Sequence, residues 1–82
     1  MLIALDYDKT YTADSALWDS FISQAHSCGH EVVIVTMRNA DTELVVDAPV
    51  PVIYTNRKAK QSFVNADIWI DDSPHWVFQD AL

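Results

Sequence analysis

The sequence is poor in several features on which common protein classes depend. Its 82 residues contain one cysteine and one glycine, too few for an internal disulfide framework or a glycine-rich phosphate or dinucleotide loop. A single cysteine fits a reducing compartment, and we expect a cytoplasmic protein. No apolar run approaches the roughly 20 residues that cross a bilayer. The apolar start meets an acid at Asp6, so we expect neither a signal peptide nor membrane association.

Basic residues are also scarce. Five lysines and arginines stand against twelve acids, which gives a formal net charge of −7 at pH 7. A chain of that charge lacks the positive field that sequence-independent binding to nucleic acid or to an anionic membrane requires. Half of the residues are hydrophobic, which is enough for the core of one small domain and argues against disorder. We therefore expect residues 1–82 to form a single acidic domain that gathers carboxylates around a cation.

Short apolar runs alternate with helical patterns along the chain. The apolar runs cover residues 2–5, 32–35, 50–54 and 68–70, and the helical patterns cover residues 15–28, 41–46, 56–65 and 76–81. Asp14 or Ser15 can cap the first helix, Gly29 stands where its C-terminus needs a positive φ, and Ser73-Pro74 opens the last helix. Continuous apolar strands are typical of parallel sheets. The order predicts a small, doubly wound, Rossmann-like α/β/α fold of three layers with a mainly parallel four-stranded sheet.

Polar residues of a particular kind follow each predicted strand. They are Asp6 and Asp8, then Thr36, then Lys58 and Lys60, and finally Asp71 and Asp72. Taken singly, each is as compatible with a helix cap, a turn or a solvated surface as with a site. In open α/β sheets, however, ligands bind beyond the carboxyl ends of the strands. We therefore expect these side chains to meet at one edge of the sheet.

The chemistry of that combination is specific. Four carboxylates in one cleft repel one another unless a divalent cation is bound, and hard oxygen ligands favour Mg²⁺ over zinc. A lysine and a hydroxyl beside the cation suit a phosphoryl group, whose oxygens they can neutralise and hydrogen-bond. A carboxylate can then attack phosphorus, while a second acid two residues away protonates the leaving oxygen and later activates water.

The same residues resemble the motifs of a known family. Residues 6–10 (DYDKT) are similar to the first motif, DxDxT, of the haloacid dehalogenase (HAD) superfamily. Thr36 is similar to the second motif, a lysine within residues 56–61 to the third, and Asp71-Asp72 to the fourth, so the resemblance covers essentially the whole chain. It implies a HAD-type core and a Mg²⁺-dependent phosphatase that hydrolyses a phosphomonoester.

The resemblance also implies roles for individual residues. Asp6 would be the nucleophile that becomes a phospho-aspartate, and Asp8 the general acid and base. Thr36 and a lysine would bind the phosphoryl oxygens. Both Lys58 and Lys60 fit the motif, and the inward positions around them favour Lys60. The implied metal ligands are Asp6, Asp8 through its backbone carbonyl, and Asp71 or Asp72.

The chain departs from the family pattern at the entrance to the site. Lys9 stands where many HAD phosphatases have glycine, and only residues 9–14 separate the first motif from the first helix, so no cap domain is expected. An open site accepts a nucleotide or another small phosphorylated molecule. A macromolecular substrate, including a nucleic acid end phosphate, stays open, as does a homodimer in which the second subunit covers the site.

Other side chains and other functions remain as alternatives. Tyr7 and Trp69 lie within or beside strands, so we expect them in the core. Tyr11, Trp76 and Arg38 either contact the leaving group or have structural roles. A receiver-like phosphoacceptor would place its acid pair first, whereas here it comes last; a non-catalytic domain that binds Mg²⁺ and phosphate is the other alternative to an enzyme.

Overall fold

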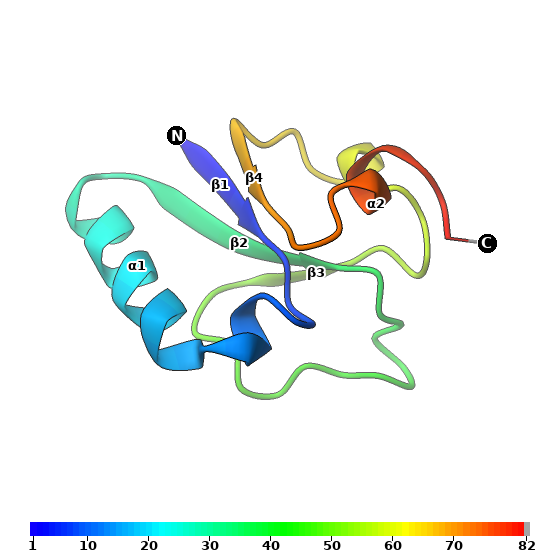
Figure 1. The fold of residues 1–82 in the computed structure, drawn as a ribbon, viewed down its shortest axis with the longest axis horizontal. Coiled ribbons are helices and arrows are strands. Elements are labelled where there is room, and N and C mark those ends of the chain that lie inside the picture. Colours follow the sequence, from blue (N-terminus) through cyan, green and yellow to red (C-terminus); the bar gives the residue numbers. More distant parts are fainter. Residues whose placement is uncertain (82) are drawn as a thin grey trace.

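The computed structural model describes residues 1–81. Its elements are β1 (Leu2–Leu5), the 3-10 helix η1 (Tyr11–Ala13), α1 (Ser15–Ser27), β2 (Glu31–Thr36), β3 (Val52–Tyr54), the 3-10 helix η2 (Lys60–Ser62), β4 (Ile68–Ile70) and α2 (His75–Phe78). The four strands form one parallel sheet in the order β3-β2-β1-β4 (Figure 1). The predicted parallel four-stranded sheet is confirmed.

The register of the sheet brings the ends of its strands together. Leu5, the last residue of β1, pairs with Ile34 of β2 and with Ile70 of β4. The backbone N–H of Asp6 donates to the carbonyl of Ile70 at 2.9 Å, which extends the pairing by one residue. The segments that follow β1, β2 and β4 therefore start from the same edge.

Both faces of the sheet are covered, but by different kinds of segment. On one face, Ile22 of α1 packs in one apolar cluster with Ile3 of β1. On the other face, Val64 packs with Ala4 and Val35. In Figure 1, α1 and α2 lie well apart on either side of the sheet, and α2 packs against η2. The strands can be apolar throughout because neither face is left to water.

Helix α1 agrees with its prediction. The carboxylate of Asp14 accepts a hydrogen bond from the N–H of Leu17 at 3.1 Å, which caps the N-terminus. The helix ends before Gly29, whose φ of +82° lies in the left-handed region that glycine adopts at little cost. None of the helices within residues 1–81 is long and apolar enough to span a membrane.

The prediction of a helix over residues 41–46 is wrong. This segment forms turns and irregular backbone. The N–H of Val45 donates to the hydroxyl of Tyr54 at 2.9 Å rather than to a helical carbonyl, and the Val45 side chain is buried in the core. Prolines 49 and 51 follow closely and prevent any extension of a helix.

The prediction of a helix over residues 56–65 is also wrong. Asn56 and Arg57 adopt positive φ values of 50° and 69°, which a right-handed helix does not accept, and only the short η2 follows. The last helix is shorter than predicted, at four residues, and the Ser73 side chain does not cap it. The layer that covers the sheet on the face opposite α1 is therefore mostly irregular backbone. The expected α/β/α arrangement has a full helix on one face only.

Candidate functional site

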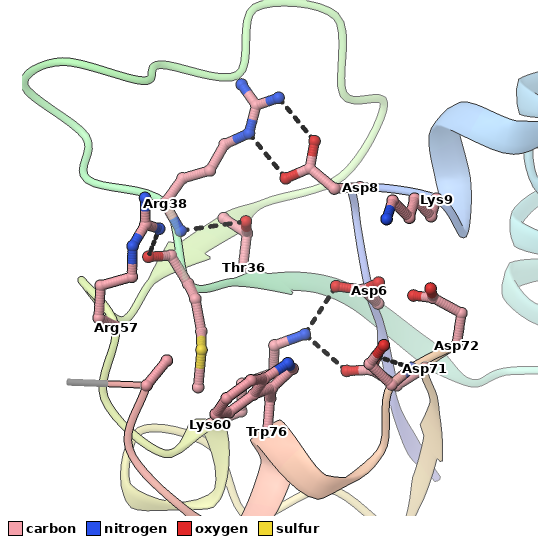
Figure 2. Close-up of a pocket in the computed structure, with 13 residues that line it drawn as sticks. Asp6, Asp8, Lys9, Thr36, Arg38, Arg57, Lys60, Asp71, Asp72 and Trp76 are labelled. Atoms are coloured by element: carbon pink, nitrogen blue, oxygen red, sulfur yellow. Dashed lines mark hydrogen bonds and ion pairs between the residues drawn. The ribbon is translucent and has the colours of Figure 1, made fainter.

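A pocket of about 290 Å³ lies at the edge of the sheet where the strands end (Figure 2). Eight charged side chains line it: Asp6, Asp8, Asp71 and Asp72, with Lys9, Arg38, Arg57 and Lys60. Four acids and four bases cancel in formal charge, although the whole chain carries −7. Four of the five bases of the chain line this one pocket, so an anion meets less repulsion there than elsewhere on the protein.

Lys60 lies at the bottom of the site between two carboxylates. Its Nζ donates to Asp6 Oδ1 and to Asp71 Oδ2, each at 2.6 Å, and the residue is only 3% exposed (Figure 2). Ala59 holds the turn before it, because its N–H donates to the carboxylate of Asp80 at 2.8 Å. The buried ammonium is therefore flanked by two carboxylates and is not left without an opposite charge.

The alternative lysine lies elsewhere. Lys58 does not line the pocket, and its Nζ makes a loose, exposed ion pair with Asp80 at 3.9 Å. In the predicted helix over residues 56–65, the spacing of the two lysines around the helix axis would have decided which of them faced the site. No such helix forms. The left-handed turn at Asn56 and Arg57 changes the direction of the backbone, and the Lys60 side chain lies in the pocket.

Thr10 connects two of the aspartates, a role that the sequence analysis did not assign. Its Oγ1 lies 3.1 Å from Asp6 Oδ2 and 3.2 Å from Asp72 Oδ1, and it accepts a hydrogen bond from the N–H of Asp72 at 3.3 Å. A hydroxyl has one hydrogen, so it donates to one carboxylate at a time. The signal available in the sequence was only its place in the motif, four residues after Asp6.

Asp6 is the most perturbed carboxyl of the pocket. Burial raises its pKa to about 6, the Lys60 ammonium opposes that rise, and the neighbouring acids Asp72 and Asp71 add to it. The pKa of Asp72 is lowered, chiefly by its hydrogen bond with Asp6. When the pKa values of two neighbouring acids are shifted in opposite directions in this way, the two carboxyls share a single proton, which Asp6 holds more readily than Asp72.

Three of the carboxylates lie close enough to share a cation. One oxygen each from Asp6, Asp71 and Asp72 can be chosen so that all lie within 4.8 Å of one another. Asp71 is already engaged at both oxygens, because Oδ2 accepts from Lys60 and Oδ1 accepts from the N–H of Ser73 at 2.9 Å. Hard oxygen donors at this density of negative charge fit a divalent cation such as Mg²⁺.

Asp8 does not join that cluster through its side chain, contrary to the expectation of four carboxylates around one cation. Arg38 holds it in a two-point contact, with Nε 2.9 Å from Oδ2 and Nη2 2.7 Å from Oδ1 (Figure 2). The Arg38 guanidinium also lies over the ring of Tyr7, 4.9 Å from its centroid. This contact with Arg38 holds the pKa of Asp8 below its usual value.

Thr36 closes the back of the pocket. It is 2% exposed, and its Oγ1 accepts a hydrogen bond from the N–H of Arg38 at 3.3 Å. Among the hydrogen bonds of residues 1–81 the Thr36 hydroxyl only accepts, which leaves its hydrogen available to donate into the pocket. The same N–H contact positions Arg38 directly after β2.

Arg57 is held at the pocket by a residue that the sequence analysis missed. Its Nη2 donates to both carboxylate oxygens of Glu43 at 3.0 and 3.1 Å, and its Nη1 donates to the carbonyl of Met37 at 2.6 Å. The backbone N–H of Asn39, with Arg57, lowers the pKa of Glu43. No local pattern relates Glu43 to Arg57, since the two residues meet only across folded loops.

Of the four aromatic residues considered as candidates, three lie in or against the core and one lines the pocket. Tyr7 is buried as expected, and Tyr11 is buried with it, the two rings stacked 5.9 Å apart. The Tyr11 hydroxyl donates to Asp19 at 2.7 Å, so Tyr11 is not a ligand contact. Trp69 packs against the core, as predicted. Trp76, in contrast, lines the pocket together with Lys60 (Figure 2).

The segments that follow β1, β2, β3 and β4 therefore each contribute charged groups to the pocket, whereas α2 contributes only Trp76. In comparisons with known proteins, no family model, no curated protein and no solved structure matches this chain. The function is accordingly inferred from the residues of the site and their geometry.

Proposed function

We propose that this protein is a Mg²⁺-dependent phosphatase of the HAD type, without a cap domain, which hydrolyses a small phosphomonoester through a phospho-aspartate on Asp6. The observation that carries the proposal is the buried Lys60 ammonium bound to Asp6 inside a cluster of carboxylates. The pocket around it gathers four of the five bases of an acidic chain. Such a site is built for an anion and a cation together.

The strand order and the two covered faces support a doubly wound, Rossmann-like sheet. In such folds the first strand lies in the middle of the sheet, and the site lies at the carboxyl ends of the strands. Here β1 lies between β2 and β4 and leads directly into Asp6. The nucleophile would therefore stand at the centre of the edge, with partners arriving from both sides.

Asp6 and Asp72 offer carboxylates for the metal ion, Asp71 lies within the same cluster, and the resemblance adds the backbone carbonyl of Asp8. When bound, Mg²⁺ would neutralise the crowded carboxylates and the phosphoryl oxygens. Lys60 contacts Asp6 and Thr36 lines the same pocket, so both could hydrogen-bond oxygens of a phosphoryl group bound at Asp6.

In the first half of the reaction, a carboxylate oxygen of Asp6 forms a bond to phosphorus while the bond from phosphorus to the leaving oxygen breaks. The leaving oxygen takes a proton from the carboxyl of Asp8. Asp8 must carry that proton, and its contact with Arg38 opposes protonation. Leaving groups that are weak bases should therefore react most easily.

In the second half, the carboxylate of Asp8 takes a proton from water. The water oxygen bonds to phosphorus, the bond between phosphorus and Asp6 breaks, and inorganic phosphate leaves. Arg38 keeps Asp8 deprotonated and therefore assists this half. The first half requires Asp8 to be protonated and the second requires it to be deprotonated. The contact with Arg38 favours the deprotonated form.

Release of p-nitrophenol from p-nitrophenyl phosphate tests the proposal. We expect turnover with MgCl₂, none with EDTA, and a loss of roughly 10³-fold or more in Asp6→Asn. Asp41→Asn is the matched control, because Asp41 is exposed and does not line the pocket. If a folded protein that binds Mg²⁺ turns over no phosphomonoester in a broad panel, the proposal is wrong.

One observation favours a second candidate function. If both oxygens of Asp8 stay bound to Arg38 after phosphorylation, neither is free to take a proton from water. A phosphoryl group on Asp6 would then be hydrolysed slowly, as in a receiver-like domain that keeps it. Intact-mass measurement after incubation with acetyl phosphate and Mg²⁺ distinguishes the two. A phospho-form that persists for minutes favours the acceptor, whereas one that appears only in Asp8→Asn favours the phosphatase.

A further inference from the structure

Three apolar side chains lie among the charged groups that line the pocket. Met37, Trp76 and Ala81 line it, and all three are half-buried. They come from three separate segments, namely the loop after β2, helix α2 and the segment after α2. Within residues 1–81, these three residues, here called the apolar wall, form the apolar surface of the pocket that a leaving group can contact.

The wall is held in place by backbone hydrogen bonds to one residue. The carbonyl of Arg57 accepts from the N–H of Ala81 at 2.7 Å, and the N–H of Arg57 donates to the carbonyl of Met37 at 2.9 Å. Arg57 can make both because its positive φ of 69° turns the chain at this point. Two of the three wall residues are therefore positioned before any ligand arrives.

Trp76 is positioned independently. The next residue in α2, Val77, is 1% exposed and anchors the helix in the core. The His75 ring lies against the indole, with centroids 4.3 Å apart. Trp76 and Lys60 both line the pocket, and helix α2, which carries Trp76, packs against η2, which begins at Lys60 (Figure 2). Because both residues line one pocket of about 290 Å³, we expect the ester substituent of a phosphoryl group bound at Lys60 to reach the indole.

We propose that the leaving group of the substrate carries a planar aromatic ring that stacks on Trp76, as the base of a nucleoside monophosphate would. This inference rests on the proposed phosphatase function. Ligand pockets usually begin at roughly 300 Å³, and this one, at about 290 Å³, suits a phosphoryl group and one ring system rather than a chain. The charge of −7 also disfavours a polynucleotide.

The size of the expected effect follows from stacking. A base on an aromatic side chain contributes roughly 5- to 150-fold in affinity. Adenosine 5′-monophosphate and ribose 5-phosphate share the same primary alkoxide leaving oxygen and differ at the base. The ratio of their kcat/KM values therefore measures what the ring adds, free of differences in leaving-group basicity. We expect a ratio of at least about fivefold in the wild-type protein.

Substitutions at Trp76 locate that preference. Trp76→Leu keeps an apolar wall without a ring, so the ratio should fall to within about twofold of unity, while Trp76→Phe should retain most of it. Phe78→Leu is the matched control, because Phe78 lies on the same helix, is 65% exposed and does not line the pocket. It should leave both rates unchanged.

The possible results distinguish failure of the stacking role of Trp76 from failure of the proposed phosphatase function. Turnover of ribose 5-phosphate without a preference for the nucleotide, or a preference that survives Trp76→Leu, overturns the stacking role and leaves the phosphatase standing. If no phosphomonoester turns over, calorimetry with the same two ligands decides. Tighter binding of the nucleotide that is lost in Trp76→Leu supports stacking, and equal or absent binding overturns it. Should Trp76→Leu not fold, the wild-type ratio and Trp76→Phe decide in the same way.

Discussion

The Nζ of Lys60 lies 2.6 Å from Oδ1 of Asp6, and both residues are buried, 3% and 8% exposed. The pair joins a turn in the second half of the chain to the end of the first strand. Asp71, which follows the last strand, accepts a second hydrogen bond from the Lys60 Nζ, also at 2.6 Å. One ammonium therefore ties together three segments and leaves none of the charges buried alone.

Lys60→Ala should destabilise the protein by about 3 kcal/mol or more, because it leaves two carboxylates buried without their partner. Lys58→Ala, which removes an exposed and loose ion pair, should change stability by less than about 0.5 kcal/mol. Urea denaturation of the two variants makes the comparison. Similar losses for both lysines would contradict the assignment of Lys60 to the site.

Asp71 and Asp72 should differ in what their loss affects. Both oxygens of Asp71 already accept hydrogen bonds, so Asp71→Asn should act chiefly on stability and on the position of Lys60. Asp72 is exposed and faces Thr10, so Asp72→Asn should weaken Mg²⁺ binding on the order of tenfold or more. Calorimetric titration with MgCl₂ measures this. A larger loss of affinity in Asp71→Asn would reverse the two roles.

Asp8→Asn should slow hydrolysis according to the leaving group. A general acid contributes about 10²–10⁴-fold, and ribose 5-phosphate, whose alkoxide needs a proton, should suffer that loss. With p-nitrophenyl phosphate the loss should be smaller, because p-nitrophenolate leaves without protonation. The measurement is kcat/KM for both substrates in both proteins, because kcat also contains the hydrolysis of the phospho-aspartate, in which Asp8 acts as a base for either substrate. Equal losses would show that Asp8 does not supply the proton.

Lys9→Gly should separate backbone strain from ligand binding. Lys9 has a φ of 66°, which glycine adopts more easily, so the variant should be unchanged in stability or gain up to about 1 kcal/mol. Lys9 makes no ion pair with a carboxylate among residues 1–81, whereas the other three bases that line the pocket do. Its loss should therefore raise KM for an anionic substrate. An unchanged KM would remove Lys9 from substrate binding.

Tyr11 should titrate late and couple stability to high pH. Its hydrogen bond to Asp19, together with burial, raises its pKa from 10.0 to about 12. Because the folded pKa lies above the unfolded one, the stabilisation is complete below pH 10 and is lost as pH rises through 12. Absorbance at 295 nm during alkaline titration reports tyrosinate. In Asp19→Ala one tyrosine should ionise earlier, and identical curves would contradict the contact.

The sequence predicted the elements whose signals are local. The strand over residues 2–5 and the helix that begins after Asp14 and ends before Gly29 depend on apolar period, a cap and one left-handed residue, all within a short window. The two helices that are absent failed for a tertiary reason. At Asn56 and Arg57, backbone bonds to the carbonyls of Arg38 and Met37 hold a left-handed turn, a conformation that asparagine tolerates but arginine adopts rarely.

The order of strands and polar residues along the chain was enough to predict that acids, a hydroxyl and a lysine meet at one edge of a parallel sheet, because all strands of such a sheet end at the same edge. Three features of the site depend on how the loops fold: that Lys60 rather than Lys58 enters it, that Arg38 holds Asp8 away from the carboxylate cluster, and that Thr10 lies between Asp6 and Asp72. These outcomes depend on contacts between residues far apart in the chain. Spacing along the sequence carries no information about such contacts until the turns between strands have folded.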